Sequence, residues 1–298
     1  MIHLSSTLAA FTSLLVISLG KINAEETTST LHTLTVTAMA EKLAEDVPVG
    51  PYNQPEWTTE RRFPTTRVYL QQMPGDVGLE QWWRVRSYNN QPATQRFQEE
   101  MEIGLPNRFQ LDLYYTWAHE AGRTRFDEAS VELRYALADW GKIPFNPTLY
   151  VEYAFTNHKY NGDTLETKLL FGDDIGRRIH WGLNVSFESE LSHELGKTLI
   201  VAGGVGYTLI DQLLSVGVEM QYNRDTVAGQ RSNPNVEFEA GPSLQWRMTK
   251  NSHLDLVGLF GCTHQGPRVE GFVVFGWDFG GKGGNKEQHG YTPTAVHQ

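Results

Sequence analysis

Charged side chains recur at alternate positions along many short segments between residues 79 and 279 of this 298-residue chain. Alternate residues of a strand point to opposite faces of a sheet, so these charges are predicted to line one polar face. In a confined space an excess of carboxylates attracts cations, whereas carboxylates paired with arginines hold a wall rigid and closed. Both interpretations apply to the predicted lining residues, which are Arg84, Arg86, Arg96, Glu100, Glu102, Asp112, Glu132, Arg134, Glu152, Glu166, Lys168, Glu188, Glu219, Glu237, Glu239, Arg247, Asp255, Glu270 and Asp278.

The positions between such polar residues are apolar or aromatic, most clearly at Phe109, Leu111, Leu113, Tyr115 and Trp117. The pattern predicts about twelve strands, near residues 78–88, 95–105, 108–119, 125–138, 148–157, 163–172, 178–190, 197–208, 212–223, 235–248, 252–262 and 269–279. A closed barrel of that size is too wide for side chains to fill, because about eight strands already pack solid. The polar face must then line the lumen, and the apolar face lies outside, where lipid tolerates it and water does not. We predict an all-β fold: a closed antiparallel transmembrane β-barrel of about twelve strands with an extended N-terminal arm.

The connections between the predicted strands alternate in length. Tight turns, such as Leu105-Pro106-Asn107 and Thr249-Lys250-Asn251, alternate with mostly longer polar loops, such as residues 223–235. In outer-membrane barrels the short turns face the periplasm and the longer loops face outward. The chain is therefore predicted to lie in the outer membrane with both termini in the periplasm. Glu99 stands at one of the alternate positions that point outward. It is expected near the extracellular rim, because a charge on the lipid face at mid-bilayer is costly.

The first residues have the features of an export signal. Leu8 to Leu19 form a mostly apolar run that is too short to span a bilayer as a helix, and Ala24 closes a stretch suited to signal peptidase. We divide the chain into a signal peptide (1–24), an extended periplasmic arm or lumen plug (25–77), the transmembrane barrel (78–279) and a polar C-terminal tail (280–298). This organisation implies two partners, the lipid bilayer and the outer-membrane insertion machinery.

Residues 25–76 do not follow the alternating pattern, and their five prolines are incompatible with a sheet interior. A short β-prone run near their start resembles the TonB box of TonB-dependent receptors, in which a free strand pairs with the sheet edge of a periplasmic partner. That resemblance implies a TonB-like partner bound by Leu34, Thr35, Val36 and Thr37. Two other interpretations stay open: a disordered periplasmic leader, and an arm that enters the barrel so that Arg61 and Arg62 meet acidic lumen residues.

Catalytic motifs are missing from the mature chain. A lipid hydrolase of the outer-membrane type needs a His two residues before a Ser, and the only such pair, His3 and Ser5, lies in the predicted signal peptide. The Gly-x-Ser-x-Gly and His-Glu-x-x-His patterns and a Gly-rich phosphate loop are also absent. We predict no catalytic residue, and a lipid hydrolase is the least favoured function.

Charge and residue content limit other functions. The net charge of −10 repels nucleic acid, so no nucleic-acid partner is expected. The single cysteine, Cys262, cannot form an internal disulfide. Four histidines, at 119, 158, 193 and 264, fall in or beside different predicted loops without a fixed ligand spacing. We therefore predict neither a metal site nor a cofactor.

Two stretches of the predicted barrel resemble a known family. Residues 99–111 form a polar strand, a turn of the Gly-Leu-x-x-Arg kind and an alternating apolar strand, and residues 272–279 form an aromatic closing strand. Both are similar to segments of the outer-membrane transporters associated with the MetA pathway of phenol degradation. The resemblance covers the barrel but not the arm, and it implies a channel for small solutes, with aromatic compounds as one candidate class.

The sequence thus favours an outer-membrane channel or transporter for small solutes, either cations or small aromatic compounds. One alternative is a non-conducting structural or partner-binding barrel whose lumen is closed by paired charges. Another is a TonB-linked uptake protein.

Overall fold

The computed structural model describes residues 43–89 and 91–280. The predicted signal peptide, the TonB-box-like residues Leu34 to Thr37 and nearly all of the predicted tail lie outside the described residues. No helix in the described ranges is both long enough and apolar enough to cross a membrane.

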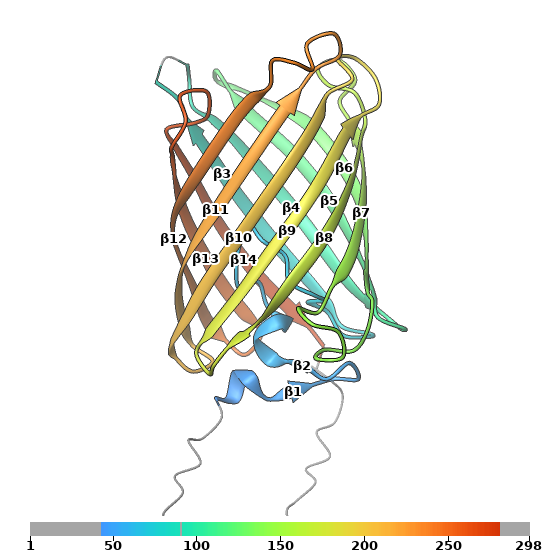
Figure 1. Cartoon of the computed structure of the whole chain (residues 1–298), viewed down its shortest axis with the longest axis vertical. Coiled ribbons are helices and arrows are strands. Elements are labelled where there is room, and N and C mark those ends of the chain that lie inside the picture. Colours follow the sequence, from blue (N-terminus) through green and yellow to red (C-terminus); the bar gives the residue numbers. More distant parts are fainter. Residues whose placement is uncertain (1–42, 90, 281–298) are drawn as a thin grey trace, which may run out of the picture. The chain divides into compact units, whose positions relative to one another are not determined.

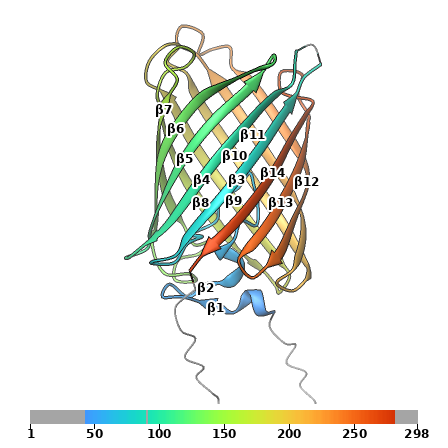
Figure 2. The ribbon, with the colours of Figure 1, turned by 180° about the vertical axis from the view of Figure 1, so that it is seen from behind.

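Twelve antiparallel strands close into one barrel, which confirms the predicted fold class (Figure 1). Each strand pairs with its neighbours in the sequence, and β14 pairs with β3 to close the barrel, as Figure 2 shows from behind. The strand bounds lie within a few residues of those predicted. They are β3 (Val77–Ser87), β4 (Thr94–Leu105), β5 (Phe109–Glu120), β6 (Arg123–Ala136), β7 (Thr148–Thr156), β8 (Thr164–Ile175), β9 (Ile179–Glu190), β10 (Lys197–Ile210), β11 (Leu214–Thr226), β12 (Asn235–Thr249), β13 (Ser252–Gly261) and β14 (Val269–Phe279).

The apolar face of the sheet points outward. Leu133 on β6 and Val151 on β7 are 38% and 40% exposed, whereas Glu132, next to Leu133 on β6, is fully buried. Tyr115 on β5 is likewise exposed, and its neighbour Thr116 is not. A continuous apolar exterior around a polar interior is the arrangement that hydrocarbon, and not water, accepts.

We call the end where β3 begins and β14 ends the base, and the opposite end the mouth. Most connections at the base are tight, as expected, but residues 137–147 between β6 and β7 form a long one. This loop packs on the arm: the backbone N–H of Trp140 donates to the carbonyl of Tyr52 at 2.9 Å. Strand alternation does not reveal this contact between the loop and the arm.

Residues 43–76, which we call the arm, fold into the base of the barrel (Figures 1 and 2). They contain only two 3-10 turns, η1 (Ala44–Asp46) and η2 (Glu56–Thr59), and a two-stranded ribbon of β1 (Pro48–Val49) and β2 (Gln54–Pro55). Prolines cannot donate to a sheet ladder, which explains why the arm stays irregular. Its apolar side chains form the main buried cluster of the described chain, which comprises Tyr52, Trp57, Phe63, Val68, Tyr69 and Leu70 together with Ala136 and Trp140.

Glycines in the wall make room for the arm. A Cβ atom at Gly204 on β10 would lie 2.7 Å from the ring of Phe63, and one at Gly182 on β9 would lie 2.7 Å from Val68. Larger residues at these positions would overlap the arm. The glycine-rich stretch of β10 therefore admits the arm.

The expected position of Glu99 was wrong. It lies midway along β4, opposite Gln81 on β3 and Tyr115 on β5, with its side chain on the outer face. Its two cross-strand neighbours carry polar groups, so the carboxylate is flanked by polar atoms on an otherwise apolar surface.

Candidate functional site: the lumen plug and the vestibule

Arg61 of the arm is the centre of a buried ion-pair cluster. Its guanidinium contacts Glu80 at 2.6 Å, Glu100 at 3.2 Å and Glu102 at 3.1 Å, and these side chains are all at most 2% exposed. The same guanidinium lies 4.6 Å from the centre of the Trp82 ring. A buried charge is tolerated only when it is paired and hydrogen-bonded, so Arg61 fixes the arm against β3 and β4.

Two further arginines extend this attachment. Arg67 donates to Glu100 at 2.7 Å, and its backbone N–H and carbonyl both bond the side-chain amide of Asn184 on β9. Arg62 donates to Glu45 at 2.9 Å within the arm and to Thr208 on β10 at 3.2 Å. The arm is thus held from opposite sides of the lumen.

Glu45 shows the electrostatic consequence of these contacts. Burial alone would raise the pKa of its carboxyl group, but hydrogen bonds from His180, Thr208 and Arg62 and the positive charge of Arg62 outweigh that effect. The pKa of Glu45 falls from its ordinary value of 4.5 to about 2. The carboxyl group of Glu45 is therefore ionised in the folded chain.

Six carboxylates stand side by side across β4 to β9, each directly opposite the next in the strand register. We call this the carboxylate row; its members are Glu102, Asp112, Glu132, Glu152, Glu166 and Glu188. Because barrel strands are tilted, the row climbs along the wall from Glu102, near the base end of β4, to Glu188, near the mouth end of β9. Like charges placed directly opposite destabilise a sheet, so the row requires cations.

The two halves of the row meet this requirement differently. In the base half, Arg61 contacts Glu102, and Arg134 forms ion pairs with both Asp112 and Glu132. In the mouth half, Lys168 contacts Glu166 at 2.9 Å, but neither Glu152 nor Glu188 forms an ion pair within the described part of the chain. The excess negative charge of the row is therefore concentrated near the mouth.

The mouth half of the row faces a polar cavity of about 730 Å³, which we call the vestibule. Pro64, Thr65 and Arg67 of the arm line it together with wall residues, so the arm closes its inner end. Its walls include Glu152, Glu166, Glu188, Lys168, Arg84 and Arg96, and the aromatic residues Trp82, Tyr114 and Tyr150. The lumen is thus a vestibule on the mouth side and a filled plug on the base side.

In the observed strand pairing, every predicted lining residue stands at one of the alternate positions whose side chains point into the lumen. Besides the groups described above, Arg84 and Arg86 both pair with Glu270, and Arg96 pairs with Asp127 and Glu128. Four others reach the arm or a neighbouring side chain: Arg247 pairs with Glu56 and Glu60, Glu219 accepts from Thr65, Asp278 accepts from Gln72, and Asp255 contacts His253. Glu237 on β12 accepts a hydrogen bond from Asn235. Glu239 on the same strand faces the lumen of the barrel and forms no ion pair in the described part of the chain.

Several lumen residues were not predicted. Glu80, His180 and His253 share the parity of the predicted residues on β3, β9 and β13, so the alternation rule identifies them once it is applied to every position. The inward face is also apolar in one sector, where Val257, Leu259, Phe272 and Val274 pack beside Trp82. Nothing in the alternation distinguishes this sector from an outward face.

Comparisons with known proteins bear on the fold. No protein-family model matches the sequence, and neither does any curated protein. Among solved structures, the NanC porin matches with a TM-score of 0.50 at 11% identity, over 68% of this chain and 99% of that protein. An outer-membrane channel from Pseudomonas putida F1 (TM-score 0.48, 8% identity, 74% and 100% coverage) and the KdgM porin (0.46, 12%, 68% and 99%) are also similar. The likeness to the NanC porin shows that this chain has the fold of a porin barrel.

Proposed function

We propose that this chain is an outer-membrane channel for small solutes that favours cations, and that the arm is the plug of its closed state. The carboxylate row carries this proposal. It leads from the vestibule toward the base, and its mouth half has one lysine for three carboxylates. In a narrow polar lumen such a wall stabilises cations and repels anions.

The arm sets the conditions for passage. A cation that enters from the mouth meets Glu188, Glu166 and Glu152, and then the guanidinium of Arg67 at the floor of the vestibule. Arg67 repels it, so conduction requires the arm to leave the lumen or to shift within it. The aromatic solutes implied by the family resemblance are a second candidate class, which Trp82, Tyr114 and Tyr150 in the vestibule wall favour.

The membrane setting is part of the proposal. The apolar exterior supports insertion into the bilayer, and the predicted signal peptide (1–24) supplies export. We assign the base to the periplasm, because most of the short turns lie there. TonB-linked uptake stays a prediction, since residues 34–37 lie outside the described residues.

Planar-bilayer recording of the full chain tests the function. The proposal predicts current steps that carry mainly cations, together with long closed periods. The buried ion pairs of Arg61 favour a different candidate, a barrel that never conducts. Recording the double variant Arg61→Gln/Arg67→Gln separates the two, because absence of current from this variant as well would leave only the non-conducting barrel.

A further inference from the structure

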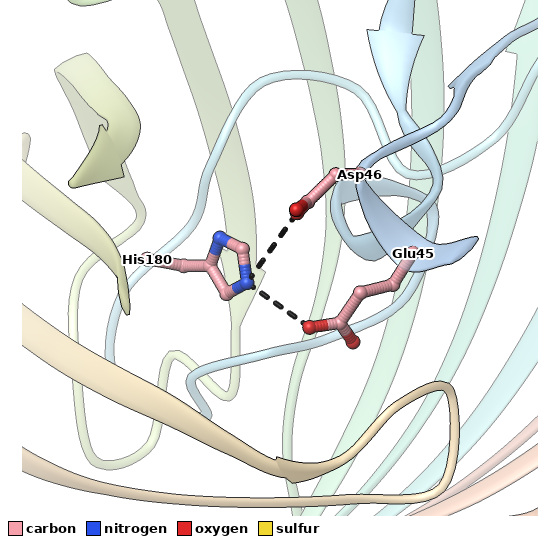
Figure 3. Close-up of side chains that lie close together, drawn as sticks. All are labelled: Glu45, Asp46 and His180. Carbon is pink, nitrogen blue, oxygen red and sulfur yellow. Dashed lines mark hydrogen bonds and ion pairs between the residues drawn. The ribbon is translucent and has the colours of Figure 1, made fainter. Parts of the chain in front are cut away.

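Residues 43–89 and 91–280 contain two buried groups in which three metal-ligating atoms lie within 4.8 Å of one another. The first consists of Glu80, Glu100 and Glu102, and the guanidinium of Arg61 contacts all three carboxylates. The second consists of Glu45 and Asp46 on η1 and His180 on β9 (Figure 3). In this second group an imidazole nitrogen faces both carboxylates, and the guanidinium of Arg62 contacts the far oxygen of Glu45.

The second group has the dimensions of a metal site. Nε2 of His180 lies 3.1 Å from Oε1 of Glu45 and 3.9 Å from Oδ1 of Asp46, and the three side chains are at most 7% exposed. Ligand atoms bound to one Zn²⁺ ion lie about 3.3 Å apart, because each bond is about 2.0–2.2 Å long. Small side-chain shifts would therefore bring all three ligand atoms into a single coordination sphere.

The residues around this group resemble the outer layer of a metal site. Nδ1 of His180 lies 2.8 Å from Oδ1 of Asp174, a contact that orients the ring so that Nε2 is directed at the two acids. The far oxygen of Glu45 accepts from Arg62, and its near oxygen accepts from the hydroxyl of Thr208. Ligating carboxylates are commonly hydrogen-bonded in this way.

Three carboxylates surround the imidazole of His180. Glu45, Asp46 and Asp174 supply three negative charges to the group, whereas Arg62 supplies one positive charge. The Trp57 ring lies tilted against the imidazole with 4.6 Å between the ring centres, and its indole N–H donates to Asp174. Asp211 accepts from the backbone of Ala44 and Glu45, which places η1 beside the imidazole.

We propose that Glu45, Asp46 and His180 bind a divalent transition-metal ion of the zinc type. Imidazole and carboxylate donors suit such ions. Two ligands belong to the arm and one to the wall, so the ion would fasten the arm at the base of the barrel. Binding to Nε2 displaces any proton that it carries, so the affinity should fall on acidification. The proposal concerns binding alone and holds whether or not the barrel conducts.

Calorimetric titration of the chelator-treated full chain with ZnCl₂ tests this site. Wild-type protein is expected to bind one ion tightly, and His180→Gln or Glu45→Gln is expected to weaken that binding at least tenfold. Glu45 belongs to the arm, so its variant remains informative if His180→Gln fails to assemble. Titration with CoCl₂ provides a second readout, since the absorption of bound Co²⁺ reports nitrogen and oxygen ligands.

His253→Gln is the matched control. His253 on β13 is also buried and contacts a carboxylate through Nδ1, Asp255 at 2.6 Å, but its Nε2 faces the single carboxylate of Glu80 at 3.6 Å. This variant should keep wild-type zinc affinity. Equal binding by wild type and His180→Gln, or no saturable binding by wild type, would overturn the proposal and leave His180 as an ion-paired imidazolium.

Discussion

Nε of Arg61 in the arm lies 2.6 Å from Oε2 of Glu80 in the wall, and the two side chains are 1% and 2% exposed. Residues 19 positions apart in the sequence thus form a fully buried ion pair. The pair joins an irregular segment to the first strand of the barrel.

Replacing Arg61 by Gln leaves Glu80, Glu100 and Glu102 without the cation that they share. Removing one partner of a buried ion pair destabilises a protein by about 3–5 kcal/mol. We expect a loss of this size in the free energy of unfolding, measured by urea titration in detergent. Arg108→Gln is the control, because Arg108 pairs with Asp139 in a solvent-accessible position and its loss should leave the unfolding midpoint unchanged.

The close approach of Phe63 to Gly204 gives a second expectation. Gly204→Val places a side chain where the Phe63 ring lies and should expel the arm, whereas Gly203→Val on the outer face meets no atom closer than 3.5 Å at its Cβ. Trypsin should then cleave after Arg61, Arg62 and Arg67 in the Gly204 variant and spare them in the Gly203 variant. Equal protection in both would mean that the glycine does not admit the arm.

The pKa of Glu45 predicts a pH dependence. It is lowered to about 2 in the folded chain, so the ionised carboxylate stabilises the closed arrangement above about pH 5, and this contribution is lost as the pH falls toward 2. The shift corresponds to about 3 kcal/mol. Urea midpoints recorded from pH 6 to pH 2 should fall more steeply for wild type than for Glu45→Gln, and parallel curves would contradict this role.

The carboxylate row predicts ion selectivity. One carboxylate facing the pathway stabilises a passing cation by about 0.5–1 kcal/mol, so Glu152→Gln or Glu188→Gln should lower the cation-to-anion permeability ratio about two- to fivefold. Reversal potentials in a salt gradient measure this ratio. Glu99→Gln is the control, since Glu99 lies at mid-strand on the outer face and should not affect the ratio. A similar ratio in all three variants would exclude the row as the selectivity element.

The barrel was predictable because each strand obeys one local rule. Asp112 and Leu113 differ by one position and so face opposite sides, which fixes the wall residues without knowledge of distant contacts. The boundaries followed from turns such as Pro106-Asn107, where Asn107 has a positive φ of 58°.

The plug could be raised only as one of several possibilities, for a physical reason. Arg61 and Arg62 pair with residues across the lumen. Residues 43–76 have no repeating pattern from which these wall residues could be predicted. The long β6–β7 loop and the group around His180 depend on the same non-local packing. Counting residues through the pairings of six strands does recover the carboxylate row, but only when the first and last residues of each strand are known.

A disulfide tether between the arm and the wall tests whether the arm closes the lumen. A Cβ at Gly204 lies 2.9 Å from Cγ of Phe63. Phe63→Cys and Gly204→Cys, with Cys262→Ser, should therefore meet the Cβ separation of about 3.5–4.5 Å that a disulfide needs. We expect the oxidised protein to carry almost no current in a planar bilayer, and reduction to restore cation-selective steps. Equal current before and after reduction would contradict an arm that closes the lumen.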